Sequence, residues 1–172
     1  MEATATPGRA SGTTATNETN QYLTFKLEEE TFALDISKVR EVLEYTPVTK
    51  VPRMPSFMKG VINVRGSVVP VVDMRVKFGM HAGERTVNTC IIIVEVMVDE
   101  GSNILGALVD SVQEVIELES ENIERAPNIG MRLNNEFIRG MGKHNDRFVI
   151  ILDVDKVFSS DEINVMADGV EV

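Results

Sequence analysis

Residues 56–78 read SFMKGVINVRGSVVPVVDMRVKF, and residues 136–158 read EFIRGMGKHNDRFVIILDVDKVF, a second version of the same pattern. The two stretches align without a gap when the first is shifted by 80 positions, so that residue 57 meets residue 137 and residue 78 meets residue 158. The identical pairs are Phe57 and Phe137, Gly60 and Gly140, Val69 and Val149, Asp73 and Asp153, and Phe78 and Phe158. Repetition over such a length indicates that one structural unit occurs twice in the chain.

A second pair of matching segments precedes these stretches. Residues 33–37 match residues 107–111, a shift of 74 positions. Residues 39–44 match residues 112–117, a shift of 73 positions, after the deletion of one residue. Because the matching segments come in the same order in both halves, the sequence predicts two similar subdomains, at about residues 22–78 and 88–158, that pack against each other.

Each repeat contains short segments separated by tight turns. Residues 22–27 alternate apolar and polar side chains, which is the period of a half-buried strand. Residues 61–64 and 67–72 predict a hairpin around Arg65 and Gly66, because glycine supplies the positive φ that a two-residue turn needs. About five short strands per repeat close most easily as a small barrel, which removes exposed edges. The sequence therefore predicts an all-β fold.

Two local patterns allow more detailed predictions. Residues 39–45 fit a short helix as well as a strand, and their β-branched and aromatic content favours a turn leading into a strand. Asp73 and Asp153 each end a strand and precede a short helical pattern. Both carboxylates are expected to accept hydrogen bonds from the free N–H groups at the start of the helix.

The two ends of the chain differ in composition from the repeats. Residues 1–20 are rich in Thr, Ala, Ser, Gly and Asn, which predicts a disordered N-terminal tail. Residues 159–172 have polar residues at the start and apolar residues behind them, which predicts a C-terminal helix and tail. The repeated domain is expected over residues 21–160.

Composition and charge exclude several classes of function. The chain has 172 residues, a net charge of −10 and a pI of about 4.7, and such a surface repels nucleic-acid backbones and anionic membranes. No apolar run approaches the length of a membrane span. The N-terminus lacks the basic residues and the apolar run of a secretory signal, so none is expected. The single cysteine fits a reducing, cytoplasmic setting. No nucleic-acid binding and no membrane insertion are expected.

A search for catalytic chemistry finds none. His81, His144 and Cys90 lack the spacing of a zinc site, and no nucleophile, metalloprotease or phosphate-binding motif occurs. We therefore expect no enzyme activity, no metal and no cofactor. Two alternatives stay open: a small β-barrel ligand-binding protein or enzyme of unknown chemistry, which a deep pocket with convergent polar groups would favour, and a self-assembling structural module.

Two charged residues stand out from the core pattern. Arg65 lies at a hairpin tip, where an ordinary solvated turn arginine explains it as well as a functional one does. Glu41 lies among apolar residues and recurs as Glu114. It is either a solvent-facing carboxylate on an edge strand or a charge that sets specificity at an interface.

The order of these motifs resembles the CheW family of chemotaxis coupling proteins. The most specific block runs from Gly60 to Arg75 and includes GVINVRG and VPVVDMR. Weaker matches are FALDI at 32–36, VREV at 39–42, GALVD at 106–110 and VQEV at 112–115. The likeness covers about residues 21–160.

This resemblance implies two SH3-like, five-stranded β-barrel subdomains with short helical turns around a shared hydrophobic seam. It also implies a non-catalytic adaptor that joins the cytoplasmic tip of methyl-accepting chemotaxis receptors to the regulatory domain of the histidine kinase CheA, through barrel ends that pair pseudo-symmetrically. The receptor-binding groove carried over from the family lies between the subdomains and comprises Val39, Glu41, Gly60, Asn63, Arg65, Gly106, Val112 and Val115, with Val109 and Asp110 as additional interface residues.

Overall fold

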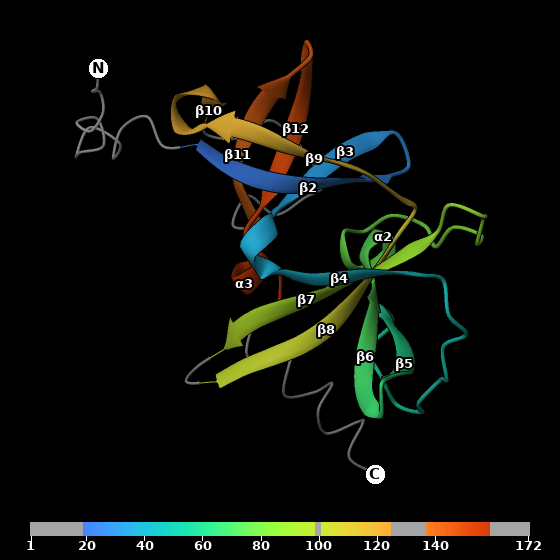
Figure 1. Cartoon of the computed structure of the whole chain (residues 1–172). Helices are drawn as coiled ribbons and strands as arrows, with labels where there is room; N and C mark the ends of the chain where they lie inside the picture. Colours follow the sequence, from blue (N-terminus) through green and yellow to red (C-terminus); the bar gives the residue numbers. More distant parts are fainter. Residues whose placement is uncertain (1–18, 99–100, 125–136, 159–172) are drawn as a thin grey trace.

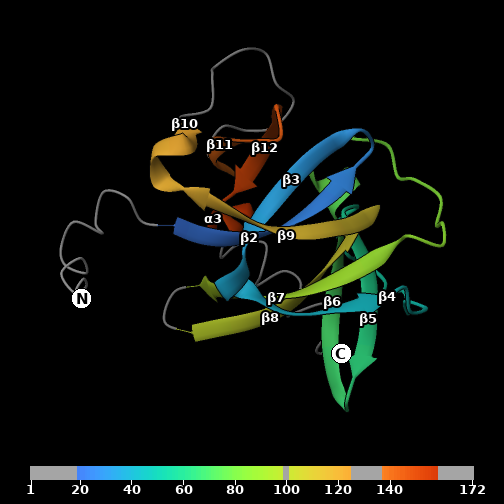
Figure 2. The same ribbon diagram turned by 45° about the horizontal axis from the view of Figure 1, so that its top comes forward.

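The computed structural model describes residues 19–98, 101–124 and 137–158, which form two β-sheets (Figure 1). The six-stranded sheet has the order β10-β11-β12-β3-β2-β9, and the five-stranded sheet the order β4-β7-β8-β6-β5. The two sheets lie one above the other in Figures 1 and 2. The all-β prediction is confirmed, with β10 as a two-residue addition to one sheet.

The strands of the six-stranded sheet are β2 (Thr19–Leu27), β3 (Glu30–Asp35), β9 (Ser111–Glu119), β10 (Ile123–Glu124), β11 (Ile138–His144) and β12 (Arg147–Leu152). Those of the five-stranded sheet are β4 (Val39–Glu44), β5 (Met58–Val64), β6 (Ser67–Asp73), β7 (Cys90–Val98) and β8 (Gly101–Val109). Single helical turns are η2 (Ile36–Lys38), α2 (Met74–Lys77), η3 (Ser120–Asn122) and α3 (Val154–Val157).

The sheets do not follow the two halves of the sequence. The hairpin β2–β3 comes from the first half but lies in one sheet with β9 to β12, and the hairpin β7–β8 comes from the second half but lies with β4 to β6. Each exchanged hairpin attaches through a parallel pair, β3 to β12 and β8 to β6. The expected subdomains at 22–78 and 88–158 therefore differ from the sheets, because local patterns fix a hairpin but not the sheet that it joins.

The exchange is reciprocal and makes the two sheets pseudo-equivalent. Each sheet combines a hairpin of one half (β2–β3 or β7–β8) with a strand and a hairpin of the other half (β9 and β11–β12, or β4 and β5–β6). The chain passes between the sheets through η2 and again at Asp110, the residue between β8 and β9. Each half of the sequence thus contributes the same set of strands, and gives one hairpin of that set to the sheet of the other half.

Three apolar clusters follow from this arrangement. Each sheet curls around a small cluster of its own, one containing Tyr22, Ile116 and Ile151 and the other Ile62, Val71 and Ile91. The largest cluster, here called the central cluster, takes residues from strands of both sheets and from α2 and α3; its fully buried members include Phe25, Leu27, Val72, Ile92 and Val96. Burial of this shared surface holds the sheets together.

Several local predictions can be compared directly with the structure. The segment at 39–45 forms strand β4 after the turn η2, as favoured. The hairpins β5–β6 and β11–β12 turn through two residues that all have positive φ, Arg65 and Gly66 in one and Asn145 and Asp146 in the other. This pair of left-handed residues matches the twist of the strands.

The two expected helix caps turn out differently. Asp73 accepts hydrogen bonds from the N–H groups of Arg75 (3.0 Å) and Val76 (3.4 Å), so this cap is confirmed. Asp153 stands at the N-cap position of α3 as predicted, but its side chain makes no capping hydrogen bond, so the expected bond is wrong.

The expected tail at 1–20 and the expected helix at 159–172 fall mostly outside the described residues; β2 already begins at Thr19. Among the described residues, no helix has the length and apolar character needed to cross a membrane.

Candidate functional site

The tip of the β5–β6 hairpin is fixed by its own residues. Arg65 and Gly66 occupy the turn with φ values of 49° and 90°. The Asn63 side-chain oxygen accepts a hydrogen bond from the Gly66 N–H (2.9 Å), which ties the turn to the end of β5. Asn63 is thus a turn-forming residue, and the tip holds the Arg65 side chain in a defined place.

The Arg65 guanidinium lies against the Glu41 carboxylate in a two-pronged ion pair. One nitrogen donates to Oε1 (3.3 Å) and the other to Oε2. Glu41 lies on the outer strand β4 and Arg65 in the turn that follows the other outer strand, β5, so this pair connects the two edges of the five-stranded sheet. The hydrogen bond from Arg65 lowers the pKa of Glu41, and the same bond raises the pKa of Arg65.

An open hollow lies beside this ion pair. We call it the first hollow; it measures about 560 Å³ and is lined by Arg40, Glu41, Val64, Arg65, Ser67, Val68, Val69, Ile93, Ser102, Asn103 and Ile104. Its remaining cation is also paired, since Arg40 donates to Glu95 (2.8 Å). Val68 at its rim is 56% exposed. The first hollow therefore combines an exposed apolar side chain with charges that neutralise one another.

The two predicted glycines act through packing. Gly60 has a φ of +147°, and a Cβ there would lie 2.2 Å from the Thr49 carbonyl oxygen. A Cβ at Gly106 would lie 2.9 Å from the Ile91 Cγ2 atom. Both glycines are buried, so they let backbone and side chains approach closely inside the five-stranded sheet and offer no side chain to a partner.

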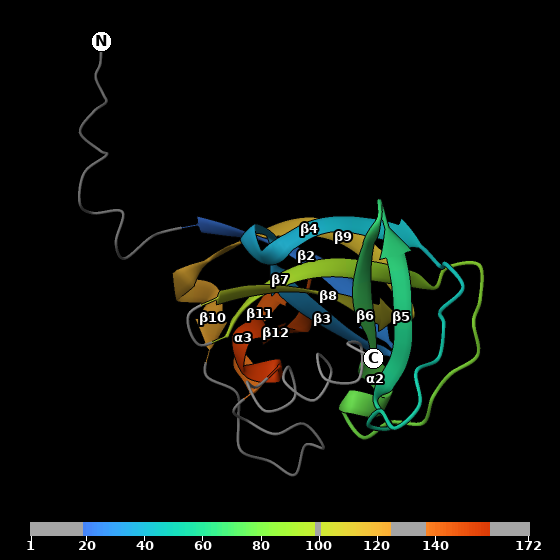
Figure 3. The same cartoon turned by 90° about the horizontal axis from the view of Figure 1, so that it is seen from below.

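The predicted valines lie on the two outer strands β4 and β9. Val39 and Val112 are half-buried against the central cluster. Val115 is 48% exposed, and its counterpart in the repeat, Val42, is 40% exposed. The two strands run along the same side of the molecule (Figure 3). Val42 was not predicted, although the match between residues 39–44 and 112–117 could have pointed to it.

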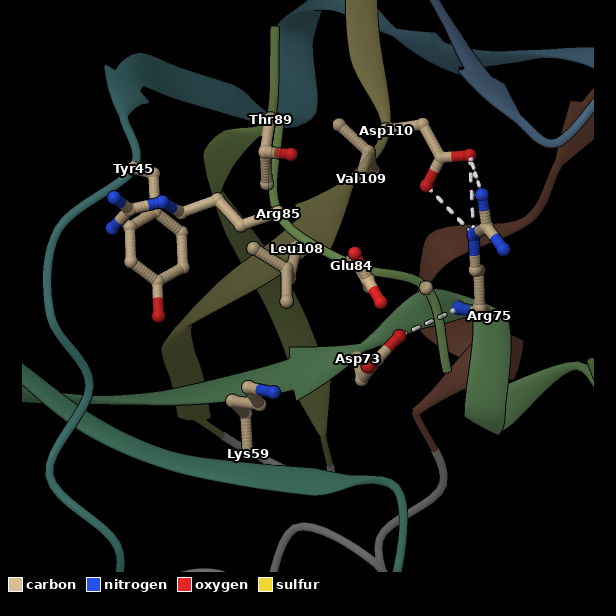
Figure 4. A pocket seen from close by; sticks show the side chains of 11 residues that line it. Tyr45, Lys59, Asp73, Arg75, Glu84, Arg85, Thr89, Leu108, Val109 and Asp110 are labelled. Atoms are coloured by element: carbon tan, nitrogen blue, oxygen red, sulfur yellow. Dashed lines mark hydrogen bonds and ion pairs between the residues drawn. The ribbon is translucent and has the colours of Figure 1, made fainter. Parts of the chain in front are cut away.

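The additional residues Val109 and Asp110 lie where the chain crosses between sheets. Val109 is 1% exposed and belongs to the central cluster. Asp110 accepts hydrogen bonds from Arg75 of α2, at 2.8 Å from Nε and 2.5 Å from Nη2 (Figure 4). It accepts another from the Glu28 backbone N–H at 2.7 Å. The bond to Asp110 raises the pKa of Arg75. Asp110 thus stabilises the point at which the chain passes from one sheet to the other. Its partner Arg75 was not predicted from the sequence as a site residue.

The structure brings three predicted residues into one cluster, namely Glu41, Asn63 and Arg65. The valines form a separate set along β4 and β9, and the glycines lie inside the five-stranded sheet. Within residues 19–98, 101–124 and 137–158, no group of three or more His, Cys, Asp or Glu side chains is arranged to hold a metal ion.

The protein thus has two interlocked sheets around a shared core, and a charged hairpin tip lies at the edge of one of them. These features define a two-subdomain all-β protein. The model of the CheW-like domain matches residues 21–162, and this chain belongs to the CheW family.

Similar proteins span nearly the same length. The chain is 36% identical over 163 residues to the chemotaxis protein CheW of Klebsiella aerogenes, covering 95% of this chain and 94% of that protein. It is 34% identical over 147 residues to the CheW protein of Rhizobium meliloti, covering 86% and 92%. The crystal structure of the scaffolding protein TtCheW from Thermoanaerobacter tengcongensis matches with a TM-score of 0.74 at 34% identity, covering 83% and 90%. These matches confirm the family and the fold.

Proposed function

We propose that this protein is a cytoplasmic, non-catalytic adaptor of chemotaxis that couples the tips of methyl-accepting chemotaxis receptors to the histidine kinase CheA. Membership of the CheW family supports this, as does a relative that is described as a scaffolding protein. The geometric observation that carries the proposal is the exposed, pseudo-symmetric pair Val42 and Val115 on two outer strands of different sheets, with the Arg65–Glu41 pair on the same sheet as Val42.

The receptor helix would contact β4, β9 and the β5–β6 tip. An amphipathic helix places apolar side chains on one stripe, and exposed valines on two neighbouring sheets suit such a stripe. Val39 and Val112 would support the surface from below, because they pack against the central cluster. Arg65 and Glu41 would fix the register of the helix and reject wrong partners more than they supply affinity.

The kinase contact would use the hairpin tips. Val68 on β6 is 56% exposed, and Phe148, its counterpart on β12, is 58% exposed. Exposed apolar side chains at equivalent places on the two sheets suit a partner with a similar duplicated fold, whose own tips can pair with them. Val68 lines the first hollow together with Arg65 and Glu41, so at the β5–β6 tip the kinase surface adjoins the one proposed for the receptor, whereas Phe148 lies on the other sheet.

The experiment is co-sedimentation of the purified full chain with receptor-bearing membranes, with and without CheA. We expect sedimentation with receptor alone and recovery of CheA in the pellet only when this protein is present. Arg65→Ala should reduce co-sedimentation, whereas Lys50→Ala, which removes an exposed cation elsewhere, should not. Equal sedimentation by wild type and Arg65→Ala would count against the proposed register residue, and no sedimentation of the wild type would overturn the function.

A further inference from the structure

A second hollow lies in the six-stranded sheet, between the tip of β11–β12 and the strands β2, β3 and β9. It measures about 250 Å³ and is lined by Thr24, Lys26, Thr31, Gln113, Glu114, Ile116, His144, Asn145, Arg147 and Val149. None of the residues proposed for the receptor contact lines it.

The second hollow is the counterpart of the first. At a shift of 73 positions Glu114 takes the place of Glu41, and at a shift of 80 positions Asn145 takes the place of Arg65. The strand pairing gives the rest of the match: Phe25 pairs with Val112 as Val94 pairs with Val39. The residue after each, Lys26 in one sheet and Glu95 in the other, is therefore also equivalent. The two hollows share one framework and differ in side chains.

The differences change the charge. In the first hollow both cations, Arg40 and Arg65, have carboxylate partners. In the second hollow Gln113 and Asn145 replace these two arginines, and new cations enter, with Lys26 in place of Glu95 and Arg147 in place of Ser67.

The new cations have no acidic partner of their own. Within the described parts of the chain, neither Lys26 nor Arg147 forms an ion pair. The Glu114 carboxylate lies instead at 3.9 Å from His144. Two unpaired cations at one hollow are notable in a chain with a net charge of −10, because most of its surface repels anions.

The floor of the second hollow is held in place by hydrogen bonds. The Thr24 hydroxyl, which is 3% exposed, donates to the Glu114 carbonyl oxygen (2.7 Å) and accepts from the Glu114 N–H (3.1 Å). These bonds join β2 to β9 at the irregularity in their pairing. These bonds fix the backbone beside Lys26, which lies two residues after Thr24 on β2.

We propose that the second hollow binds an acidic side chain presented by a segment of a partner protein. A carboxylate would supply the counter-charge that Lys26 and Arg147 lack, and arginine can hold a carboxylate through two parallel hydrogen bonds. An open hollow of about 250 Å³ is smaller than the pockets that enclose small molecules, which measure about 300–1,000 Å³.

Phe148, next to Arg147 on β12, is 58% exposed but does not line the second hollow, to which β12 contributes Arg147 and Val149. Successive side chains of a strand point to opposite faces, so the hollow is left to the acidic side chain. The proposal goes beyond the adaptor function, since it rests on the charges of the six-stranded sheet and holds whether or not receptor and kinase bind as proposed.

The test is a titration of the ¹⁵N-labelled full chain, followed by NMR, with the blocked peptide Gly-Leu-Glu-Glu-Leu-Gly. We expect amide shift changes confined to residues 24–31, 113–116 and 144–149. The matched peptide Gly-Leu-Gln-Gln-Leu-Gly should bind roughly tenfold more weakly, because it lacks the charges. Equal binding of the two peptides, or shifts centred on the first hollow, would overturn the proposal.

Variants make the test specific. The double variant Lys26→Gln/Arg147→Gln should lose the response to the acidic peptide, and Lys143→Gln, which removes a cation from β11 outside both hollows, should keep it. The amide spectrum of each free variant shows whether it is folded, and the single change Arg147→Gln at the exposed tip serves if the double variant is not. Unchanged binding by the folded Gln variants would overturn the proposal. Free glutarate binding as tightly as the peptide would also do so, because it would assign the site to a small molecule.

Discussion

We propose Arg65 as a solvent-exposed residue that serves receptor binding while it contributes little to stability. Its ion pair with Glu41 is open to water, and exposed pairs contribute little to stability. We expect Arg65→Ala to leave the melting temperature at pH 7 nearly unchanged while it weakens receptor binding. Thermal denaturation by circular dichroism measures the first effect and the co-sedimentation described above the second. A large fall in melting temperature would show that the residue is structural.

The same pair makes a prediction about pH. Arg65 lowers the pKa of Glu41 in the folded state, so the carboxylate contributes stability above the pKa of the unfolded chain, and this contribution is lost as the pH falls through the lowered value. In Arg65→Ala the pKa of Glu41 should rise toward that of an ordinary glutamate. Carbon-detected NMR titration of the Glu41 carboxyl group measures the change, and an unaltered pKa would contradict the pairing.

Gly60 is a residue at which substitution should affect stability directly. A Cβ at this position would lie 2.2 Å from a backbone oxygen and would require a φ of +147°, so we expect Gly60→Ala to destabilise the fold by about 2–4 kcal/mol. Gly101→Ala is the control, because a Cβ there meets nothing within 4 Å. Urea denaturation compares the two variants, and similar midpoints would show that position 60 accepts a side chain without loss of stability.

At the scale of elements, two ion pairs fasten the points where the chain crosses between the sheets. Arg75 of α2 binds Asp110 at one crossing. Asp155 of α3, the counterpart of Arg75 in the repeat, binds Lys38 of η2 at the other (3.1 Å). The charges are reversed, so that both cations come from the first half and both anions from the second. This distribution of charge favours pairing of a first half with a second half. Two first halves would bring Lys38 and Arg75 together, and two second halves would bring Asp110 and Asp155 together.

This pattern predicts a rescue. Arg75→Asp places a carboxylate against Asp110 and should destabilise the protein by about 1–3 kcal/mol, because both side chains are partly buried. The double variant Arg75→Asp/Asp110→Arg should recover part of this loss. A double-mutant cycle from chemical denaturation measures the coupling. Additive losses in the double variant would refute a specific pair.

The elements also show what could be predicted from the sequence. Alternation and turn residues were sufficient for β2, for β4 and for the β5–β6 hairpin with its two-residue turn, because these features depend on neighbours in the chain. The exchange of β2–β3 and β7–β8 was not predictable, since it depends on which distant strand each hairpin meets. The repeat did not determine side-chain contacts either: Asp73 caps α2, while Asp153 makes no such bond.

The candidate site shows the same division. Glu41 and Arg65 were singled out as unusual charges, and the structure places them in contact. Their pairing across the edges of a sheet, and the exposure of Val42, required the fold. The second hollow could be recognised only from the sequence and the structure together. The sequence repeat relates it to the first hollow, and the structure shows that Lys26 and Arg147 form no ion pair among the described residues.

At the scale of the whole molecule, the interlocked sheets should unfold together. Neither sheet can form from one half of the chain alone, and both share the central cluster. The chain has no Trp and only two Tyr, Tyr22 in the six-stranded sheet and Tyr45 just after β4. In Tyr22→Phe and Tyr45→Phe variants the remaining tyrosine reports on one region. We expect its fluorescence and the circular dichroism to give coincident transitions in urea within each variant. Separate midpoints would show that the two sheets are independent domains.

The most direct test of the adaptor role is analytical ultracentrifugation of this protein with a purified receptor-tip fragment and the regulatory domain of CheA. We predict a complex of all three species. Arg65→Ala should release the receptor fragment while the kinase domain stays bound, and Phe148→Asp on the other sheet should do the reverse. If the receptor fragment and the kinase domain displace each other, or if the unmodified protein binds neither, the proposed coupling is contradicted.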